Sequence, residues 1–288
     1  NLFVNDLDKK KSNKLIKLGA TWCENLETIA DKSSIIITCL PNPTSVNKVI
    51  NTLFPHLNKT HLWIEMSTTD ELEMKRLSNL CKKNKIGCLE APMTGGQHRA
   101  ESGNIAILAG GERKYFNRAL PILSKIGHEI LFCGQIGSAS ILKVVTNYLA
   151  SINLLSLGEA LMVCKKYGLN LKTSYHGIRI SSGNSFVHET ESQVILNGSY
   201  DVGFTMDLVC KDVGLFDKLT DRFKIPAEIS KLMNKIFQEG KKKYGNRSLS
   251  TSIIRRIEES CNDNLRSPGF PSTLKDYQPK QKGIEIKF

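Results

Sequence analysis

The sequence predicts an α/β domain followed by an all-α domain, and its 288 residues are enough for two hydrophobic cores. Short apolar runs alternate with amphipathic helical segments up to about residue 132. Beyond Gly137 the apolar residues have helical spacing, and no segment is convincingly a strand. Alternating strands and helices favour a mostly parallel sheet covered by helices, whereas consecutive helices favour a separate helical domain.

The strands expected in the first domain are short apolar runs bounded by turn-forming residues. They lie at 2–5, 34–40, 62–66, 86–90, 105–108 and 129–132. Segments with helical spacing separate them, near 8–18, 44–54, 70–84 and 112–125. The first domain is therefore expected to cover residues 1–137.

The second domain is expected to begin with one long helix over about 139–168, because Gly168 supplies a natural helix stop. Further helices are expected near 171–180, 187–196, 206–222, 226–241 and 249–258. This helical domain covers residues 138–260. The sequence loses its periodicity from Cys261 onward, so residues 261–288 are expected to form a mobile tail.

The composition is that of an ordinary globular protein, with 40% hydrophobic and 24% charged residues. No uninterrupted apolar run approaches the roughly 20 residues that cross a bilayer, so no membrane association is expected. The eight cysteines form no C-x-x-C pair, which indicates free thiols rather than a zinc site or disulfides. The net charge of +12 is spread along helical segments, so no nucleic-acid partner is expected.

A glycine-spaced turn at Gly134–Gly137 precedes the long helix, which carries Lys143 and, one turn later, Asn147. Residues four apart share a helix face, so both side chains can point the same way. Burial on an apolar face lowers the pKa of a lysine and makes it a proton donor or acceptor near neutral pH. Taken alone, a surface lysine with a polar neighbour explains such a pair equally simply.

Asp6 follows the first expected strand. In dinucleotide-binding folds, an acidic residue at the end of the second strand accepts hydrogen bonds from the ribose hydroxyls. The glycine-rich turn that should precede this residue by about 20 positions is absent from residues 1–288. An aspartate that only begins a loop is the alternative.

The segments that follow, in their order, resemble the β-hydroxyacid dehydrogenase family, which includes 3-hydroxyisobutyrate dehydrogenase, tartronate semialdehyde reductase and, more remotely, 6-phosphogluconate dehydrogenase. The resemblance covers nearly everything from Asn1 to about Glu259. The matching segments are Asp6 with Gly19-Ala20, Thr38–Ser45, Glu65–Thr68, Glu90–Gly103, Gly134–Asn147 and Phe204–Leu215. The resemblance implies a Rossmann-like domain without its first strand and glycine turn, followed by an all-α domain.

The resemblance also implies roles for individual residues. Lys143 corresponds to the catalytic general acid/base, and Asn147 to the residue that orients the substrate oxygen. Thr94, which replaces the usual serine, would hold the substrate carboxylate together with Gly95 and Gly96. The residues implied in cofactor binding are Asp6, Leu40, Pro41, Ser45, Thr68 and Lys211.

NAD is expected as cofactor rather than NADP, because Asp6-Leu7-Asp8 stands where members that prefer NADP tend to have Asn-Arg-Thr. Aspartate would repel a 2′-phosphate, and no arginine stands ready to receive it. No metal is expected in the reaction. His98 and Arg99, which follow the carboxylate loop, could bind an additional anionic group of the substrate or simply face solvent.

The sequence therefore predicts an oxidoreductase that transfers a hydride between NAD and a small, carboxylate-bearing β-hydroxy acid, as a homodimer or homotetramer. The alternative is an impaired or non-enzymatic scaffold, because the pyrophosphate-binding segment is absent. An imine reductase on the same scaffold is less favoured, since such relatives usually replace the catalytic lysine. The chain is further expected to be a fragment that binds NAD weakly. Its expected compartment is the cytoplasm, or the mitochondrial matrix if a transit peptide preceded Asn1.

Overall fold

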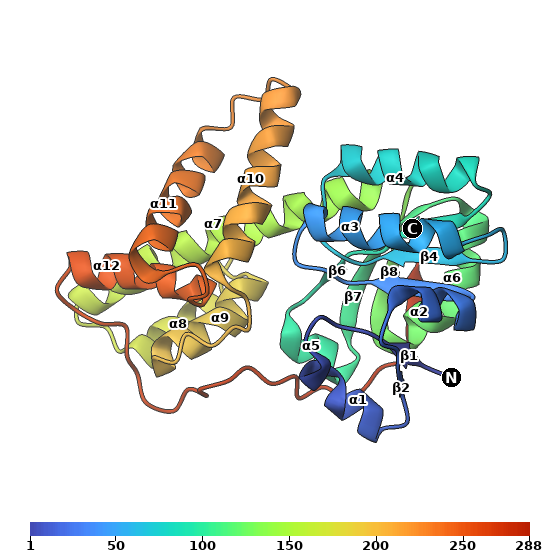
Figure 1. Ribbon diagram of the computed structural model, residues 1–288. Helices are drawn as coiled ribbons and strands as arrows, with labels where there is room; N and C mark the ends of the chain where they lie inside the picture. The colour runs from blue at the N-terminus through green and yellow to red at the C-terminus, as the bar shows by residue number, and fades with distance from the viewer. The chain divides into compact units, whose positions relative to one another are not determined.

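The computed structural model describes residues 1–288, which divide into two compact units. Unit 1 comprises Asn1–Thr94, Ala106–Leu142 and Lys282–Phe288. Unit 2 comprises Gly95–Ile105 and Lys143–Gln281. Figure 1 shows the α/β elements of unit 1 and the helices of unit 2. The predicted fold class, a Rossmann-like domain followed by a helical domain, is confirmed.

Unit 1 is built on a seven-stranded sheet in the order β3-β4-β5-β7-β8-β9, with β6 paired to β7. The strands β3, β4 and β5 are parallel, β7 is antiparallel to β5 and to β6, and β9 is parallel to β8. Their bounds are β3 Ile35–Thr38, β4 Leu62–Glu65, β5 Gly87–Glu90, β6 Met93–Thr94, β7 Ile105–Gly111, β8 Gly127–Gly134 and β9 Ile284–Ile286. All four residues of β4 are buried, as expected for a central parallel strand covered on both faces.

Two of the helices that cover the large sheet begin where the sequence supplies a cap. Asn42 caps α3 through a 2.8 Å bond from Ser45 N, and Pro43 occupies its first turn. Asp70 caps α4 by accepting from the amides of Leu72 and Glu73. Apolar residues of these helices pack around the fully buried Trp63 of β4. The sheet helices are α3 Pro43–Leu53, α4 Glu71–Lys83 and α6 Arg113–Ile126.

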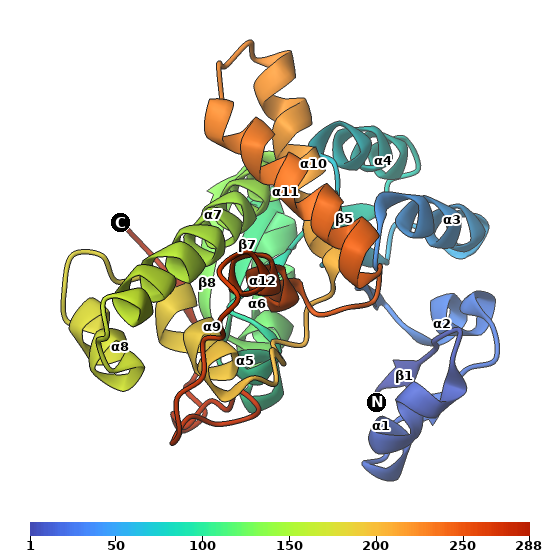
Figure 2. The same ribbon diagram turned by 90° about the vertical axis from the view of Figure 1, so that its left-hand side faces the viewer.

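A separate two-stranded parallel sheet joins β1 (Phe3–Val4) to β2 (Thr21–Trp22). The short helix α1 (Asn13–Lys17) connects these strands, and α2 (Leu26–Lys32) follows them. Figure 2 shows this group of elements beside the rest of unit 1. No hydrogen-bonded strand links β1 or β2 to β3, so the α/β domain contains two sheets.

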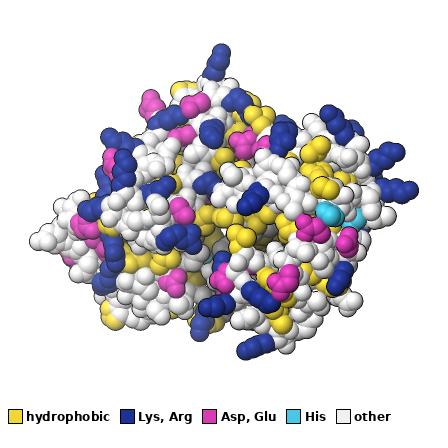
Figure 3. Space-filling model, viewed as in Figure 1, with side chains coloured by type: hydrophobic (Ala, Val, Ile, Leu, Met, Phe, Trp, Pro, Cys, Tyr) yellow, Lys and Arg dark blue, Asp and Glu magenta, His cyan; other side chains and the backbone are white.

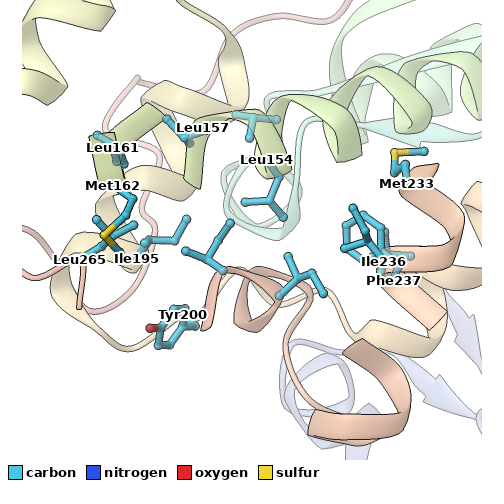
Figure 4. Packing of buried hydrophobic residues seen from close by; sticks show 14 of the residues in the cluster. Leu154, Leu157, Leu161, Met162, Ile195, Tyr200, Met233, Ile236, Phe237 and Leu265 are labelled. Atoms are coloured by element: carbon cyan, nitrogen blue, oxygen red, sulfur yellow. The ribbon is translucent and has the colours of Figure 1, made fainter. Parts of the chain in front are cut away.

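Unit 2 is a helical bundle, apart from its first segment, which carries α5 (Gln97–Ser102). Its core is one cluster of buried apolar residues that includes Leu154 and Leu161 of α7, Tyr200, and Phe237 of α11 (Figure 4). The helices are α7 Ser138–Lys166, α8 Leu171–Arg179, α9 Phe186–Asn197, α10 Met206–Arg222, α11 Glu228–Tyr244 and α12 Arg255–Ser260. The helix expected near 249–258 begins as a 3-10 helix over Ser250–Ile254.

The C-terminal segment corrects the expectation of a mobile tail over 261–288 and of no strand after Gly137. Leu265 is fully buried, and Asp276 accepts hydrogen bonds from Ser102 and Asn104. Residues Ile284–Ile286 form β9 beside β8. A strand of three residues carries too little periodicity to be recognised, and the same holds for β2 and β6.

By length and composition, α7 is the one helix in the chain that could span a membrane. Single polar residues interrupt its apolar pattern without ending the helix, so it is not an uninterrupted apolar run, and the expected lack of membrane association stays a prediction. One such helix is weak evidence, since core helices have the same composition, and α7 contributes Leu154, Leu157 and Leu161 to the core of unit 2. Figure 3 shows lysines and arginines spread over the face in view.

Candidate active site

Lys143 is a buried lysine on α7, with 8% of its surface exposed. Burial disfavours its charged form and lowers its pKa to about 8, a direction that nearby Lys211 reinforces and Asp212 opposes. A lysine with this pKa exists in both protonation states near neutral pH. It can therefore take up or release a proton in a reaction.

Asn147 accepts a hydrogen bond from Lys143, and Asp212 in turn accepts one from Asn147. Lys143 Nζ donates to Asn147 Oδ1 at 2.7 Å, and Asn147 Nδ2 donates to Asp212 Oδ2 at 2.5 Å. Because the carboxylate can only accept, it fixes which end of the Asn147 amide faces the lysine. The structure thus brings together Lys143 and Asn147, whose shared face the sequence predicts.

Asp212 was not singled out from the sequence, although it is the best buried member of this group, at 2% exposure. It lies on α10 beside Lys211, whose Nζ is 3.1 Å from Asp212 Oδ1. This places the predicted cofactor residue Lys211 in the same network as Lys143. The adjacent Lys-Asp pair in the sequence was the feature that could have pointed to Asp212. The sequence could not show, however, that this aspartate binds Asn147, 65 residues away.

The first turn of α7 is anchored by Glu90, a second residue that sequence reasoning did not select. Glu90 Oε1 accepts from the amides of Gly137 at 2.7 Å and Ala139 at 2.9 Å, and Oε2 accepts from Ser140 Oγ at 2.5 Å. Burial raises the pKa of the carboxyl, and these hydrogen bonds oppose that shift. A Cβ at Gly110 would stand 2.4 Å from Glu90 Oε1, so only glycine fits there.

The predicted carboxylate loop joins β6 to α5. Thr94 ends β6, where it pairs with Ala106 of β7. Gly95 and Gly96 then adopt φ values of +123° and +85°, which side chains rarely allow. Both glycines are therefore favoured by the backbone conformation, with the side chains of Arg99 and His98 close beside them.

The predicted loops after β3 and β4 meet at the carboxyl ends of these parallel strands. Leu40 N donates to Ser67 Oγ at 2.7 Å. Below them, the buried Glu65 accepts from the amide of Ser67 at 2.6 Å and from the Thr38 hydroxyl. This edge of an open α/β sheet is where nucleotide ligands bind. Pro41 and Thr68 lie on the same two loops, and Ser45 lies in the first turn of α3, which follows the first of them.

Asp6 lies in the loop after β1, where its Oδ1 accepts from Asp8 N at 2.8 Å and stands 3.9 Å from Lys11 Nζ. Its side chain is 41% exposed, so the carboxylate is accessible to a ligand. The strand that Asp6 follows, β1, is part of the two-stranded sheet and not of the larger one. No group of three or more His, Cys, Asp or Glu side chains in residues 1–288 is placed to bind a metal ion.

The fold and these residues define a class, namely a Rossmann-like nucleotide-binding domain with a helical domain that carries a buried lysine. Two family models match the chain. Residues 1–135 match the NAD binding domain of 6-phosphogluconate dehydrogenase, and residues 137–257 match the NAD-binding domain of NADP-dependent 3-hydroxyisobutyrate dehydrogenase. The chain belongs to the β-hydroxyacid dehydrogenase family, and it has NAD(P)-binding domains.

Curated relatives agree with this assignment. The 2-(hydroxymethyl)glutarate dehydrogenase of Eubacterium barkeri is 29% identical over 90% of this chain and 87% of its own length. A probable mitochondrial 3-hydroxyisobutyrate dehydrogenase of Dictyostelium discoideum is 28% identical over 75% of this chain and 70% of its own.

Solved structures share the fold. A 3-hydroxyisobutyrate dehydrogenase from Salmonella typhimurium superposes with a TM-score of 0.80 at 20% identity, covering 88% of this chain and 90% of that one. An imine reductase from Myxococcus stipitatus, at 16% identity, covers the same shares of both chains with a TM-score of 0.58. At these identities the likeness concerns the fold alone.

Proposed function

We propose that this protein oxidises or forms a small β-hydroxy acid by hydride exchange with NAD, with Lys143 as the general acid/base. Its family consists of NAD(P)-dependent hydroxyacid dehydrogenases, which supports the hydride transfer. The observation that carries the role of Lys143 is its burial, with a pKa of about 8, against Asn147 and Asp212. NAD, when bound, accepts or supplies the hydride.

In the oxidation direction, neutral Lys143 removes the hydroxyl proton of the substrate. In the reduction direction, its ammonium returns a proton to the carbonyl oxygen. Asn147 orients the substrate oxygen beside the lysine, and Asp212 keeps the Asn147 amide in the required orientation. Asp212 is a positioning residue, because it acts through Asn147.

The substrate carboxylate is assigned to Thr94, Gly95 and Gly96. The hydroxyl of Thr94 and the amides of the two glycines suit an anion, since glycine adds no side chain of its own beside these backbone donors. Lys211 adds positive charge near Lys143. These assignments limit the substrate class to small hydroxy acids.

The cofactor residues fit the nicotinamide half of NAD, since Leu40, Pro41 and Thr68 lie at the carboxyl ends of β3 and β4, and Ser45 lies in the first turn of the helix that follows β3. The exposed carboxylate of Asp6 suits ribose hydroxyls better than a 2′-phosphate, which supports NAD over NADP. Residues 1–288 contain no Gly-x-Gly-x-x-Gly turn for the pyrophosphate.

A homo-oligomer joined through α7 is the assembly that we favour. Only 33% of the apolar part of this helix is buried, and Leu149 and Val163 are 50% and 70% exposed. Exposed apolar side chains on a long helix commonly mark contacts between subunits. The relatives include mitochondrial and bacterial proteins, so the compartment stays a prediction.

The test is NAD-linked oxidation of a panel of small β-hydroxy acids, by residues 1–288 and by the same residues extended with a glycine-rich strand and turn. We expect Lys143→Ala to lower kcat by about two to four orders of magnitude, the usual contribution of a general acid/base. Lys166→Ala is the control, because this lysine ends the same helix and lies partly exposed beside Asp263.

Full turnover in Lys143→Ala would refute the catalytic role. Absence of both activity and cofactor binding in the wild-type proteins would favour the scaffold alternative. Reduction of cyclic imines in preference to hydroxy acids would favour the imine reductase alternative.

A further inference from the structure

Arg99 carries a guanidinium for which the structure shows no acidic partner. Its guanidinium takes part in no hydrogen bond or ion pair of the chain and contacts only the ring of Phe186, at 4.7 Å from the ring centroid. Four other arginines are ion-paired with carboxylates, namely Arg76, Arg113, Arg247 and Arg266. A partly buried cation without a counterion has donors available for an anion.

Arg99 lies directly against the proposed carboxylate loop. Its Cδ is 3.2 Å from the point where a Cβ of Gly95 would stand, and His98 Cε1 is 3.0 Å from the corresponding point at Gly96. The His98 ring stacks on Phe186 with ring centroids 6.3 Å apart. Both side chains therefore pack against the ring of Phe186 and lie close to the glycine loop.

The acidic groups near Arg99 are already engaged. Asp276 accepts from Ser102 Oγ at 2.6 Å and from Asn104 Nδ2 at 2.9 Å, and Glu101 accepts from Gln97 at 3.0 Å. The charge of Asp276 interacts electrostatically with His98 and Arg99, but Asp276 forms no ion pair with either residue. The guanidinium can therefore take a further anion.

We propose that Arg99, supported by Phe186 and flanked by His98, binds a second carboxylate of the substrate, so that the protein prefers dicarboxylic β-hydroxy acids over monocarboxylic ones. This inference rests on the proposed function, because it places the first carboxylate on Thr94, Gly95 and Gly96. The planar fork of a guanidinium matches a carboxylate with two parallel hydrogen bonds, which favours this group as the ligand.

The test compares matched substrates that differ in one charge. The dicarboxylate 2-(hydroxymethyl)pentanedioate is measured against the monocarboxylate 2-(hydroxymethyl)pentanoate, as kcat/KM and as the dissociation constant from calorimetry. We expect the wild type to prefer the dicarboxylate. Arg99→Met should reduce this preference by about 10- to 100-fold, the range of a charge-assisted hydrogen bond pair, and Arg99→Lys should restore part of it.

The control is Arg255→Met, which removes another arginine stacked on an aromatic ring, that of Tyr200, and should leave the preference unchanged. A wild type active on the monocarboxylate with no preference for the dicarboxylate overturns the inference and leaves the proposed function standing. An Arg99→Met variant in which kcat/KM falls by the same factor for both substrates also overturns the inference and leaves the proposed function standing. A wild type that neither binds nor oxidises either substrate overturns the proposed function and this inference together.

Discussion

At the scale of single residues, the chemistry of this protein depends on how Lys143 is solvated. An exposed lysine stays charged at neutral pH, whereas Lys143 is buried and its pKa falls to about 8. Asp212 keeps that shift from going further, because a nearby negative charge favours the ammonium. One buried aspartate thus limits the pKa shift of the lysine and orients Asn147.

This pKa gives a pH dependence of opposite sign in the two directions of the reaction. Oxidation needs neutral Lys143, so kcat/KM for the hydroxy acid should rise as pH increases through about 8. Reduction needs the ammonium, so kcat/KM for the carbonyl compound should fall through the same range. Initial rates between pH 6 and pH 10 check this, with Lys143→Arg expected to lose the transition. Profiles that move in the same direction for both reactions would contradict the assignment.

At the scale of elements, the start of α7 depends on a residue from another strand. The first turn of a helix has amides without intrahelical partners, and Glu90 of β5 accepts from two of them and from Ser140 Oγ. Lys143 follows Ser140 by three residues on this helix. Through Glu90, strand β5 therefore holds the first turn of α7, the helix that carries Lys143.

Removing the Glu90 carboxylate should consequently destabilise unit 1. Glu90→Ala leaves three buried donors unpaired, and we expect it to lower the free energy of unfolding by about 3 kcal/mol or more. Glu90→Gln keeps an acceptor for the two amides and should cost about 1–2 kcal/mol, because it loses the charge at the helix N-terminus and the acceptor for Ser140 Oγ. Chemical denaturation of both variants measures the difference.

Glu112→Ala is the matched control for Glu90. Glu112 precedes α6 in the same unit, but its exposed side chain accepts no capping hydrogen bond. Its loss should change stability by only about 0.5 kcal/mol. Equal effects of Glu90→Ala and Glu112→Ala would show that the Glu90 contacts contribute little.

At the scale of the whole molecule, the α/β unit contains two sheets rather than one. The sheet of β1 and β2 carries Asp6, whereas the sheet of β3 and β4 carries the loops of Leu40 and Thr68. No strand hydrogen-bonded to both connects them. The two groups of proposed NAD contacts therefore belong to separate sheets of unit 1.

Residues 1–288 alone should therefore bind NAD weakly, as the sequence predicts. Backbone amides of a glycine-rich turn supply the pyrophosphate contacts in this class of fold, and these residues contain no such turn. We expect a dissociation constant at least about tenfold higher than that of the same chain extended with a glycine-rich strand and turn. Calorimetric titration of both proteins gives the two constants, and similar values would refute the expectation.

The sequence by itself determined the order of strands and helices, because the periods of its apolar residues differ between the two elements. It also placed Lys143 and Asn147 on one helix face, since this property depends on neighbours within a few positions. The family resemblance added the roles of these residues. Short elements without a full period, such as β2 and β9, escaped recognition.

Only the tertiary structure decided which distant residues meet. It brought Asp212 to Asn147, Glu90 to the first turn of α7, and β9 to the edge of β8. It also left Arg99 beside the glycine loop without an acidic partner. These contacts join residues far apart in sequence, and they form because buried polar groups must find partners wherever the packing of the core places them.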